Sequence, residues 1–115
     1  MVVREYVPEA GDLVWVDFSP QAGREQAGRR PAVVLTARFY NQTTGLAVMC
    51  PITTHAKGYP FEVQITSGER IRGVVLADHL KNIDWRYRQA QKAGRIPSTT
   101  LDQVLKRVSI LLGMT

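Results

Sequence analysis

Most of the chain consists of short apolar runs, rich in β-branched residues, that are separated by polar turns. Such runs predict strands, either alternating and half-buried or continuous and fully buried. Their expected bounds are residues 12–18, 31–36, 46–51, 61–65, 73–77 and 80–88. In the last run Ile83, Trp85 and Tyr87 would share one face of a half-buried strand. The polar residues 39–45 between the second and third runs are expected to form a turn region.

The end of the chain changes from strand periodicity to helix periodicity. After Gly94 and Pro97, apolar residues recur three and four positions apart, which predicts one helical stripe. Ser98 or Thr99 can cap the start of this helix, and Gly113 stands where a terminating glycine belongs. Five to seven short strands and one helix predict a mainly β fold, a strongly bent sheet or barrel covered on one side by the helix. The apolar stripe is Leu101, Val104, Leu105, Val108, Leu111 and Leu112.

One stretch joins a polar loop to a predicted buried strand. Residues 25–30 are charged and broken by Gly28, and residues 31–35 are continuously apolar after Pro31. Arg29 and Arg30 therefore stand where a loop meets a rigid sheet, a common way to present functional side chains. The loop before them is long, at about twelve residues, which is typical of functional or disordered segments. The alternative is an ordinary solvated loop with two surface arginines.

Length and charge narrow the function classes. The 115 residues predict a single domain, residues 1–115, that buries a core without disulfides. The net charge of +5 favours a polyanionic partner. Cys50 is the only cysteine, which fits a buried thiol in a reducing compartment. No run approaches the length of a membrane span, and the start lacks an apolar signal core. We expect a cytoplasmic protein that does not associate with a membrane.

The residue types support catalysis without a metal or a cofactor. The two histidines lie far apart, no cysteine pair exists, and no phosphate-binding glycine motif opens a helix. RNA, however, carries its own nucleophile in the 2′-hydroxyl, so an enzyme need only align it, accept its proton and stabilise the phosphoryl charge. A carboxylate, an arginine and hydroxyls suit these tasks, and Glu25, Arg30, Thr53 and Thr54 supply them. We expect His55, His79, Trp15 and Trp85 to have structural roles.

Cations with aromatic neighbours are typical of single-strand binding. Arg86-Tyr87-Arg88 and Lys57-Gly58-Tyr59 have this character. For each of these aromatic residues, packing in the core is the alternative.

Several joined motifs resemble the MazF/PemK toxin family, in the order in which that family has them. The resemblance covers nearly the whole chain and is greatest to the MazF branch. Its motifs are Gly11-Asp12-Leu13-Val14-Trp15-Val16-Asp17-Phe18, residues 25–35, Pro51-Ile52-Thr53-Thr54, Lys57-Gly58-Tyr59-Pro60-Phe61, Leu76-Ala77-Asp78, Asp84-Trp85-Arg86 and Leu111-Leu112-Gly113.

The resemblance implies a fold and an activity. The fold would be an SH3-like β-barrel of the MazF/CcdB type with a C-terminal helix, paired as a two-fold homodimer. The protein would be the toxin of a toxin–antitoxin pair, a metal-independent, sequence-specific endoribonuclease without cofactors. It would cut single-stranded messenger RNA, with ribosomal and transfer RNA as alternatives, and so stop translation and growth. The ends left would be a 2′,3′-cyclic phosphate and a 5′-hydroxyl. The antitoxin's acidic, disordered tail would lie over the same groove.

The resemblance also implies roles for individual residues. The family's catalytic arginine falls on Arg30 and its catalytic threonine on Thr53, and Glu25 is a candidate general base. RNA contacts are expected from Ser19, Arg29, Thr54, Lys57, Asp78, Lys81, Arg86 and Arg88. The RNA sequence that is cut and the identity of the antitoxin are not readable from the motifs.

Two other functions compete with RNA cleavage. The same fold occurs in toxins that resemble the gyrase poison CcdB, which bind and do not cleave. Those toxins rely on a tryptophan near the C-terminus, and residues 111–115 contain none. We also expect the last helix to commit its apolar stripe to packing. The other alternative is a nucleic-acid-binding regulator without catalysis.

Overall fold

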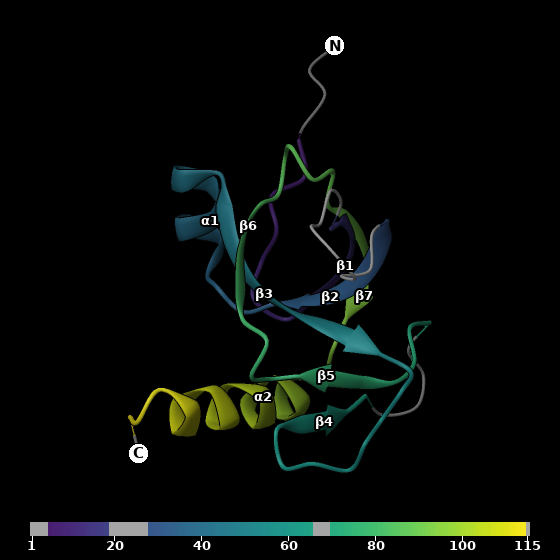
Figure 1. Ribbon diagram of the computed structural model, residues 1–115. Coiled ribbons are helices and arrows are strands. Elements are labelled where there is room, and N and C mark those ends of the chain that lie inside the picture. Colours follow the sequence, from purple (N-terminus) through teal and green to yellow (C-terminus); the bar gives the residue numbers. More distant parts are fainter. Residues whose placement is uncertain (1–4, 19–27, 66–69, 115) are drawn as a thin grey trace.

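The computed structural model describes residues 5–18, 28–65 and 70–114, and Figure 1 shows their arrangement. The described strands all pair antiparallel, in one sheet. The elements are β1 Asp12–Asp17, β2 Arg29–Val34, α1 Arg38–Thr44, β3 Leu46–Thr53, β4 Glu62–Gln64, β5 Val74–Leu76, β6 Lys81–Asp84, β7 Gln91–Arg95 and α2 Ser98–Leu111.

The long strand β3 organises the sheet. Along one edge it pairs with β2, and along the other its first half pairs with β6 and its last residues with β5. The order β4-β5-β3-β2-β1-β7 has two ends, so the described strands form a strongly bent, barrel-like sheet that is not closed. The helix α2 lies beside β4 and β5, away from α1 (Figure 1). The predicted mainly β fold with a C-terminal helix is confirmed.

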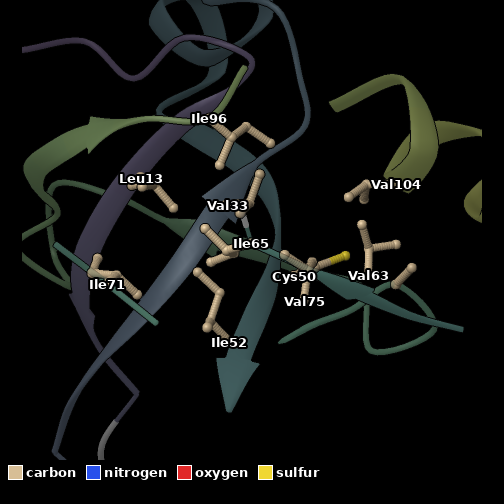
Figure 2. Packing of buried hydrophobic residues seen from close by; sticks show 11 residues of the cluster. Leu13, Val33, Cys50, Ile52, Val63, Ile65, Ile71, Val75, Ile96 and Val104 are labelled. Carbon is tan, nitrogen blue, oxygen red and sulfur yellow. The ribbon is translucent and has the colours of Figure 1, made fainter. Parts of the chain in front are cut away.

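Two apolar clusters cover the two faces of β1 and β2. Leu13 and Val33 belong to one cluster, which includes Val104 of α2, as Figure 2 shows. Val14 and Val34, one position further along each strand, belong to the other cluster. Successive side chains of a strand point to opposite faces, so these continuous apolar runs need cover on both sides. Both faces of β1 are covered in this way, and of its apolar residues only Trp15 is exposed.

The predicted turn region 39–45 is wrong, because the chain forms the helix α1 there. Its only buried residue is Asn41, whose amide donates to the carbonyls of Pro8 and Thr36. The indole of Trp85 donates in turn to the carbonyl of Asn41 at 2.9 Å. A helix anchored by one polar residue has no apolar stripe, so the hydrophobic pattern could not reveal it.

The strand predicted at 80–88 ends early, as β6, at Asp84. Trp85 is buried as expected, but the chain turns from there, and Tyr87 is 75% exposed and not on the buried face. The strand β7 was not predicted, because Gln-Lys-Ala-Gly-Arg has no apolar alternation. This strand owes its structure to pairing with β1. The second and third strands also extend beyond their predicted bounds, to begin at Arg29 and end at Thr53 respectively.

The predicted C-terminal helix is confirmed, but its caps and its packing differ from expectation. Pro97 occupies the N-cap position, and no side chain caps the helix start, so the predicted cap by Ser98 or Thr99 is wrong. Gly113 has φ +73°, and the N–H groups of Gly113 and Met114 close the helix end as predicted. The apolar stripe is only partly used for packing. Its C-terminal half is exposed at Leu105, Leu111 and Leu112, together with Ile110 and Met114.

Candidate functional site

Residues of three neighbouring strands line an open cleft of about 440 Å³, here called the Arg30 cleft. Trp15 comes from β1, Arg30 from β2 and Thr53 from β3. The segment that enters β5, residues 70–72, also lines the cleft. The full lining is Trp15, Arg30, Pro31, Ile52, Thr53, Thr54, His55, Arg70, Ile71 and Arg72. The structure thus brings together three residues that the sequence had placed in the site: Arg30, Thr53 and Thr54.

The position of Arg30 follows from how β2 begins. The first residues of β2 pair only with β1, with Pro31 opposite Trp15. Pairing with β3 begins at Ala32, so the missing N–H of Pro31 removes no bond from that ladder. The N-terminal end of β2 is therefore a free edge held at a fixed place. Within the part of the chain that the structure describes, no hydrogen bond or ion pair engages the Arg30 guanidinium.

The position of Thr53 depends on the glycine that precedes β5. Gly73 has φ +128°, a conformation that L side chains rarely adopt. A Cβ at this position would lie 2.2 Å from the Thr53 carbonyl oxygen, so only glycine lets the two backbones approach this closely. Val74 then pairs with Thr53 in the ladder between β3 and β5. The hydroxyl of Thr53 accepts the backbone N–H of His55 at 3.1 Å, which leaves the hydroxyl proton free to donate.

A second open cleft, of about 480 Å³, shares Thr53 and His55 with the first and is called the Asp78 cleft. Its other lining residues are Lys57, Tyr59, Glu62, Leu76, Asp78 and His79. The predicted RNA contacts Lys57 and Asp78 therefore lie next to Thr53. The two clefts form one path along the molecular surface, with Thr53 at their junction.

The loop that lines the Asp78 cleft is fixed by carboxylates. Glu62 accepts the N–H groups of Lys57 and Gly58 at 2.8 and 2.9 Å. The Tyr59 hydroxyl donates to Asp78 at 2.6 Å, and this hydrogen bond is the main reason why the pKa of Tyr59 rises to about 12. The phenol thus stays protonated and keeps its donor role at neutral pH. Asp78 also lies 3.7 Å from Nε2 of His79.

Two other predicted RNA contacts lie in a separate cleft of about 530 Å³ that is called the Lys81 cleft. Lys81 and Arg88 line it, together with Phe18 and Tyr87. The Lys81 ammonium lies 5.5 Å from the Phe18 ring centre, and the Arg88 guanidinium 5.7 Å from that of Tyr87. The Nη1 atom of Arg88 is buried without a hydrogen-bond partner among the described residues. This cleft shares no lining residue with the other two.

Two of the predicted RNA contacts, Arg29 and Arg86, form hydrogen bonds or ion pairs with other residues of the protein. The Arg29 guanidinium donates to the carbonyls of Trp15 at 3.0 Å and Gln89 at 2.7 Å, so it ties β1 to the turn before β7. Arg86 forms an ion pair with Glu5 at 2.6 Å and stacks 4.5 Å from the Trp85 ring centre. Neither residue lines a cleft described above. The predicted Ser19 and Glu25 lie outside the described residues.

Sequence reasoning missed four residues of the Arg30 cleft. Trp15 was expected in the core, yet it is 40% exposed on the cleft wall, whereas Trp85 is 2% exposed as expected. His55 lines both adjoining clefts. Arg70 and Arg72 carried no motif, and only their position before β5 brings them into the same cleft as Arg30. Alternation along 12–18 offered one signal, since Trp15 shares a face with Asp17, opposite the buried Val14 and Val16.

The arrangement is suited to binding a polyanion. Arg30, Arg70 and Arg72 line one cleft, and no acidic side chain among the described residues forms an ion pair with them. Three guanidinium groups beside hydroxyls can bind several phosphate oxygens. Among the residues that the structure describes, no group of three or more His, Cys, Asp or Glu side chains could hold a metal ion. Neither described helix has the length and apolar character needed to span a bilayer.

A family model described as "PemK-like, MazF-like toxin of type II toxin-antitoxin system" matches residues 9–112 of the chain. The endoribonuclease toxin MazF of Escherichia coli K12 is 49% identical over 112 residues, which is 97% of this chain and all of the relative. The endoribonuclease PemK of Escherichia coli is 34% identical over 116 residues, covering 97% of this chain and 87% of the relative. The similarity thus extends over nearly the whole sequence.

Solved structures agree with these relatives. A crystal structure of MazF from Deinococcus radiodurans superposes with a TM-score of 0.89 at 52% identity, covering 96% of this chain and all of that chain. A crystal structure of MazE-MazF from the same organism has a TM-score of 0.89 at 51% identity, with the same coverage of both chains.

Proposed function

Because the chain belongs to the family of PemK-like, MazF-like toxins of type II toxin–antitoxin systems, we propose that its Arg30 cleft cleaves single-stranded RNA without a metal. The full-length identity of 49% to MazF makes it an endoribonuclease toxin of that family. The observation that supports the cleft as the place of cleavage is the meeting of Arg30 and Thr53, from adjacent strands, in one cationic cleft. RNA cleavage by such a toxin inhibits translation.

The proposed reaction uses the substrate's own nucleophile. The 2′-oxygen of the RNA attacks the adjacent phosphorus as its proton is accepted by a base, the bond from phosphorus to the 5′-oxygen breaks, and the leaving 5′-oxygen takes up a proton from water. The products are a 2′,3′-cyclic phosphate and a 5′-hydroxyl. Arg30 meets the charge that develops on the phosphoryl oxygens, and the free proton of the Thr53 hydroxyl is donated to one of them. Glu25 is the proposed base.

The neighbouring residues extend the proposed RNA path. Thr54 lies beside Thr53, and Lys57 and Asp78 follow in the adjoining Asp78 cleft. Ser19 is retained as a proposed contact. Lys81 and Arg88 would bind a more distant part of the strand, since their cleft is separate. The internal contacts of Arg29 and Arg86 favour structural roles for these two arginines instead of direct contacts to RNA.

The cognate antitoxin is the second proposed partner. The relative from Deinococcus radiodurans that is 51% identical to this chain has been crystallised as MazE-MazF. An acidic antitoxin tail would find the same unpaired cations that we propose for RNA, so the two partners would compete. We also propose that the toxin acts in the cytoplasm, where its proposed messenger RNA substrate is found.

A homodimer is proposed on the exposed half of α2. Ile110, Leu112 and Met114 are apolar and exposed near its C-terminal end. A second copy related by a two-fold axis would cover the same patch on both subunits. Sedimentation of the wild type at micromolar concentration should show a dimer, and Ile110→Asp should shift it toward monomer, whereas Lys106→Glu on the same helix should not. A monomeric wild type that is fully active would overturn the dimer.

The cleavage proposal is tested with pure protein and end-labelled single-stranded RNA. Cleavage should persist in excess EDTA, and the new 5′ ends should carry hydroxyls. RNA with hydrogen in place of the 2′-hydroxyl at the cut position should bind and remain intact. Loss of activity on chelation that Mg²⁺ restores would overturn the metal-free mechanism. Normal cleavage of the deoxy substrate would show that the nucleophile is another group.

A further inference from the structure

We propose that Trp15, Arg70 and Arg72 form a nucleotide-binding subsite beside the cut phosphate. The Trp15 indole stacks on one unpaired base, and the two arginines bind the phosphates that flank that nucleotide. This inference rests on the proposed RNA cleavage and adds to it a base-stacking surface. The three residues line the same cleft as Arg30 and Thr53.

The exposure of Trp15 is the first observation. A large aromatic side chain stabilises a protein most when it is buried, and Trp85 is buried in this way. Trp15, by contrast, is 40% exposed at the cleft wall. Its backbone is fixed on both sides, by pairing with Pro31 of β2 and with Gln91 of β7. A rigid, exposed ring loses little entropy when a base stacks on it.

The restraint from Arg29 is the second observation. Its guanidinium donates to the Trp15 carbonyl at 3.0 Å and to the Gln89 carbonyl at 2.7 Å. This contact holds the strand at the residue whose side chain faces the cleft. Arg29 thus acts on the subsite through the backbone of Trp15 and has no need to touch the RNA.

The third observation is the charge that surrounds the ring. Arg70 and Arg72 are exposed and flank Ile71, which is buried in the core and anchors the segment. No ion pair engages either guanidinium within the described ranges 5–18, 28–65 and 70–114. Cations that track the backbone, combined with aromatic rings on which bases stack, are the features that bind single strands. In a duplex both faces of each base are already stacked, so this subsite selects unpaired RNA.

The experiment separates stacking from charge. Binding is measured with single-stranded RNA that contains the mapped cleavage sequence and a deoxynucleotide at the cut position, at several salt concentrations. Trp15→Leu should weaken binding roughly 5-fold to 150-fold, which is the usual value of one stacked base, without changing the slope of log affinity against log salt. Trp15→Phe retains a ring and should recover most of that loss. Arg70→Ala and Arg72→Ala should each lower the slope by about one unit.

Tryptophan fluorescence gives an independent signal. RNA should quench the wild-type emission, and the quench should vanish in Trp15→Phe, because only the buried Trp85 then remains. Matched controls lie on α1, away from the three clefts: Phe39→Leu for an exposed aromatic and Arg38→Ala for an exposed arginine. Both controls should keep the wild-type affinity, slope and quench.

Each other result has a defined meaning. If the wild type cleaves RNA but Trp15→Leu binds like the wild type, the subsite is overturned and the proposed function stands. If Trp15→Leu dissociates a wild-type dimer in sedimentation, the ring belongs to an interface between copies, and the stacking role is overturned. If the wild type neither binds nor cleaves RNA, the proposed function itself fails.

Discussion

At the start of β1, the Asp12 carboxylate is 1% exposed and surrounded by partners within the protein. It accepts hydrogen bonds from the Tyr6 hydroxyl and the Glu9 backbone N–H, and it pairs with Arg95 at 2.7 Å and with Lys92 at 3.8 Å. Further along the same strand, Trp15 borders a cleft whose arginines have no acidic partner among the described residues.

The difference between the surroundings of Asp12 and the Arg30 cleft separates charges that hold the fold from charges that remain available to a ligand. Burial, and after it the hydrogen bond to Asp12, raises the pKa of Tyr6. The Tyr6 phenol therefore stays protonated and keeps donating to the Asp12 carboxylate. All of these partners belong to the protein itself. The bonds to Asp12 fix β7, which contains Arg95, and the segment before β1, which contains Tyr6 and Glu9. The arginines of the cleft make no ion pair with any described residue, so their charge remains for a polyanion.

The largest effect on stability is expected from removing the Asp12 carboxylate. Asp12→Ala leaves Tyr6 and Glu9 without an acceptor and removes the partner of Arg95, so it should lower the free energy of unfolding by about 3 kcal/mol. Denaturant melts measure this loss. Asp102→Ala, an exposed acid on α2, is the control and should stay within about 0.5 kcal/mol. A negligible loss in Asp12→Ala would show that its bonds do not hold the fold.

Substitution of Arg30 in the cleft should affect the rate of RNA cleavage and not the stability of the protein. Arg30→Ala should slow single-turnover cleavage roughly 100-fold or more with an unchanged melting temperature, because one preorganised charge donor is lost. Arg30→Lys keeps the charge but loses the planar fork, so it should not recover the rate. Near-normal cleavage by either variant would remove Arg30 from the transition state.

The variant Arg29→Ala tests whether one of two adjacent arginines holds the fold while the other remains available to a ligand. Arg29→Ala removes the bonds to Trp15 and Gln89, so it should destabilise the protein by about 1 kcal/mol and slow cleavage far less than Arg30→Ala does. Thermal melts and single-turnover cleavage of one RNA measure both effects. If Arg29→Ala is inactive and Arg30→Ala is normal, the catalytic assignment is wrong by one residue.

The smallest effects sharpen the extent of the RNA path. Lys57→Ala in the Asp78 cleft and Arg88→Ala in the Lys81 cleft should each lower the slope of log affinity against log salt by about one unit, since each lost phosphate contact releases one counterion fewer. Filter binding over a salt series measures these slopes. An unchanged slope in Arg88→Ala alone would limit the path to the two clefts that meet at Thr53.

The sequence by itself determined the strands of the core and the motifs of the site. Continuous apolar runs around Val14 and Val33 must be buried on both faces, and a stripe such as Leu101–Val108 must lie against a sheet. These are local consequences of side-chain direction and water exclusion. The segments around Arg30 and Thr53 were readable for the same reason, because each adjoins such a run.

Only the tertiary structure decided which polar segments became regular and which charges stayed unpaired. The helix α1 depends on hydrogen bonds from Asn41 to distant carbonyls, and β7 depends on its pairing with β1. The exposure of Trp15 and the presence of Arg70 and Arg72 in the same cleft depend on how β1 packs in the sheet and on where Gly73 contacts Thr53. Interactions between residues far apart in sequence leave no periodic pattern, so the chain must fold before they exist.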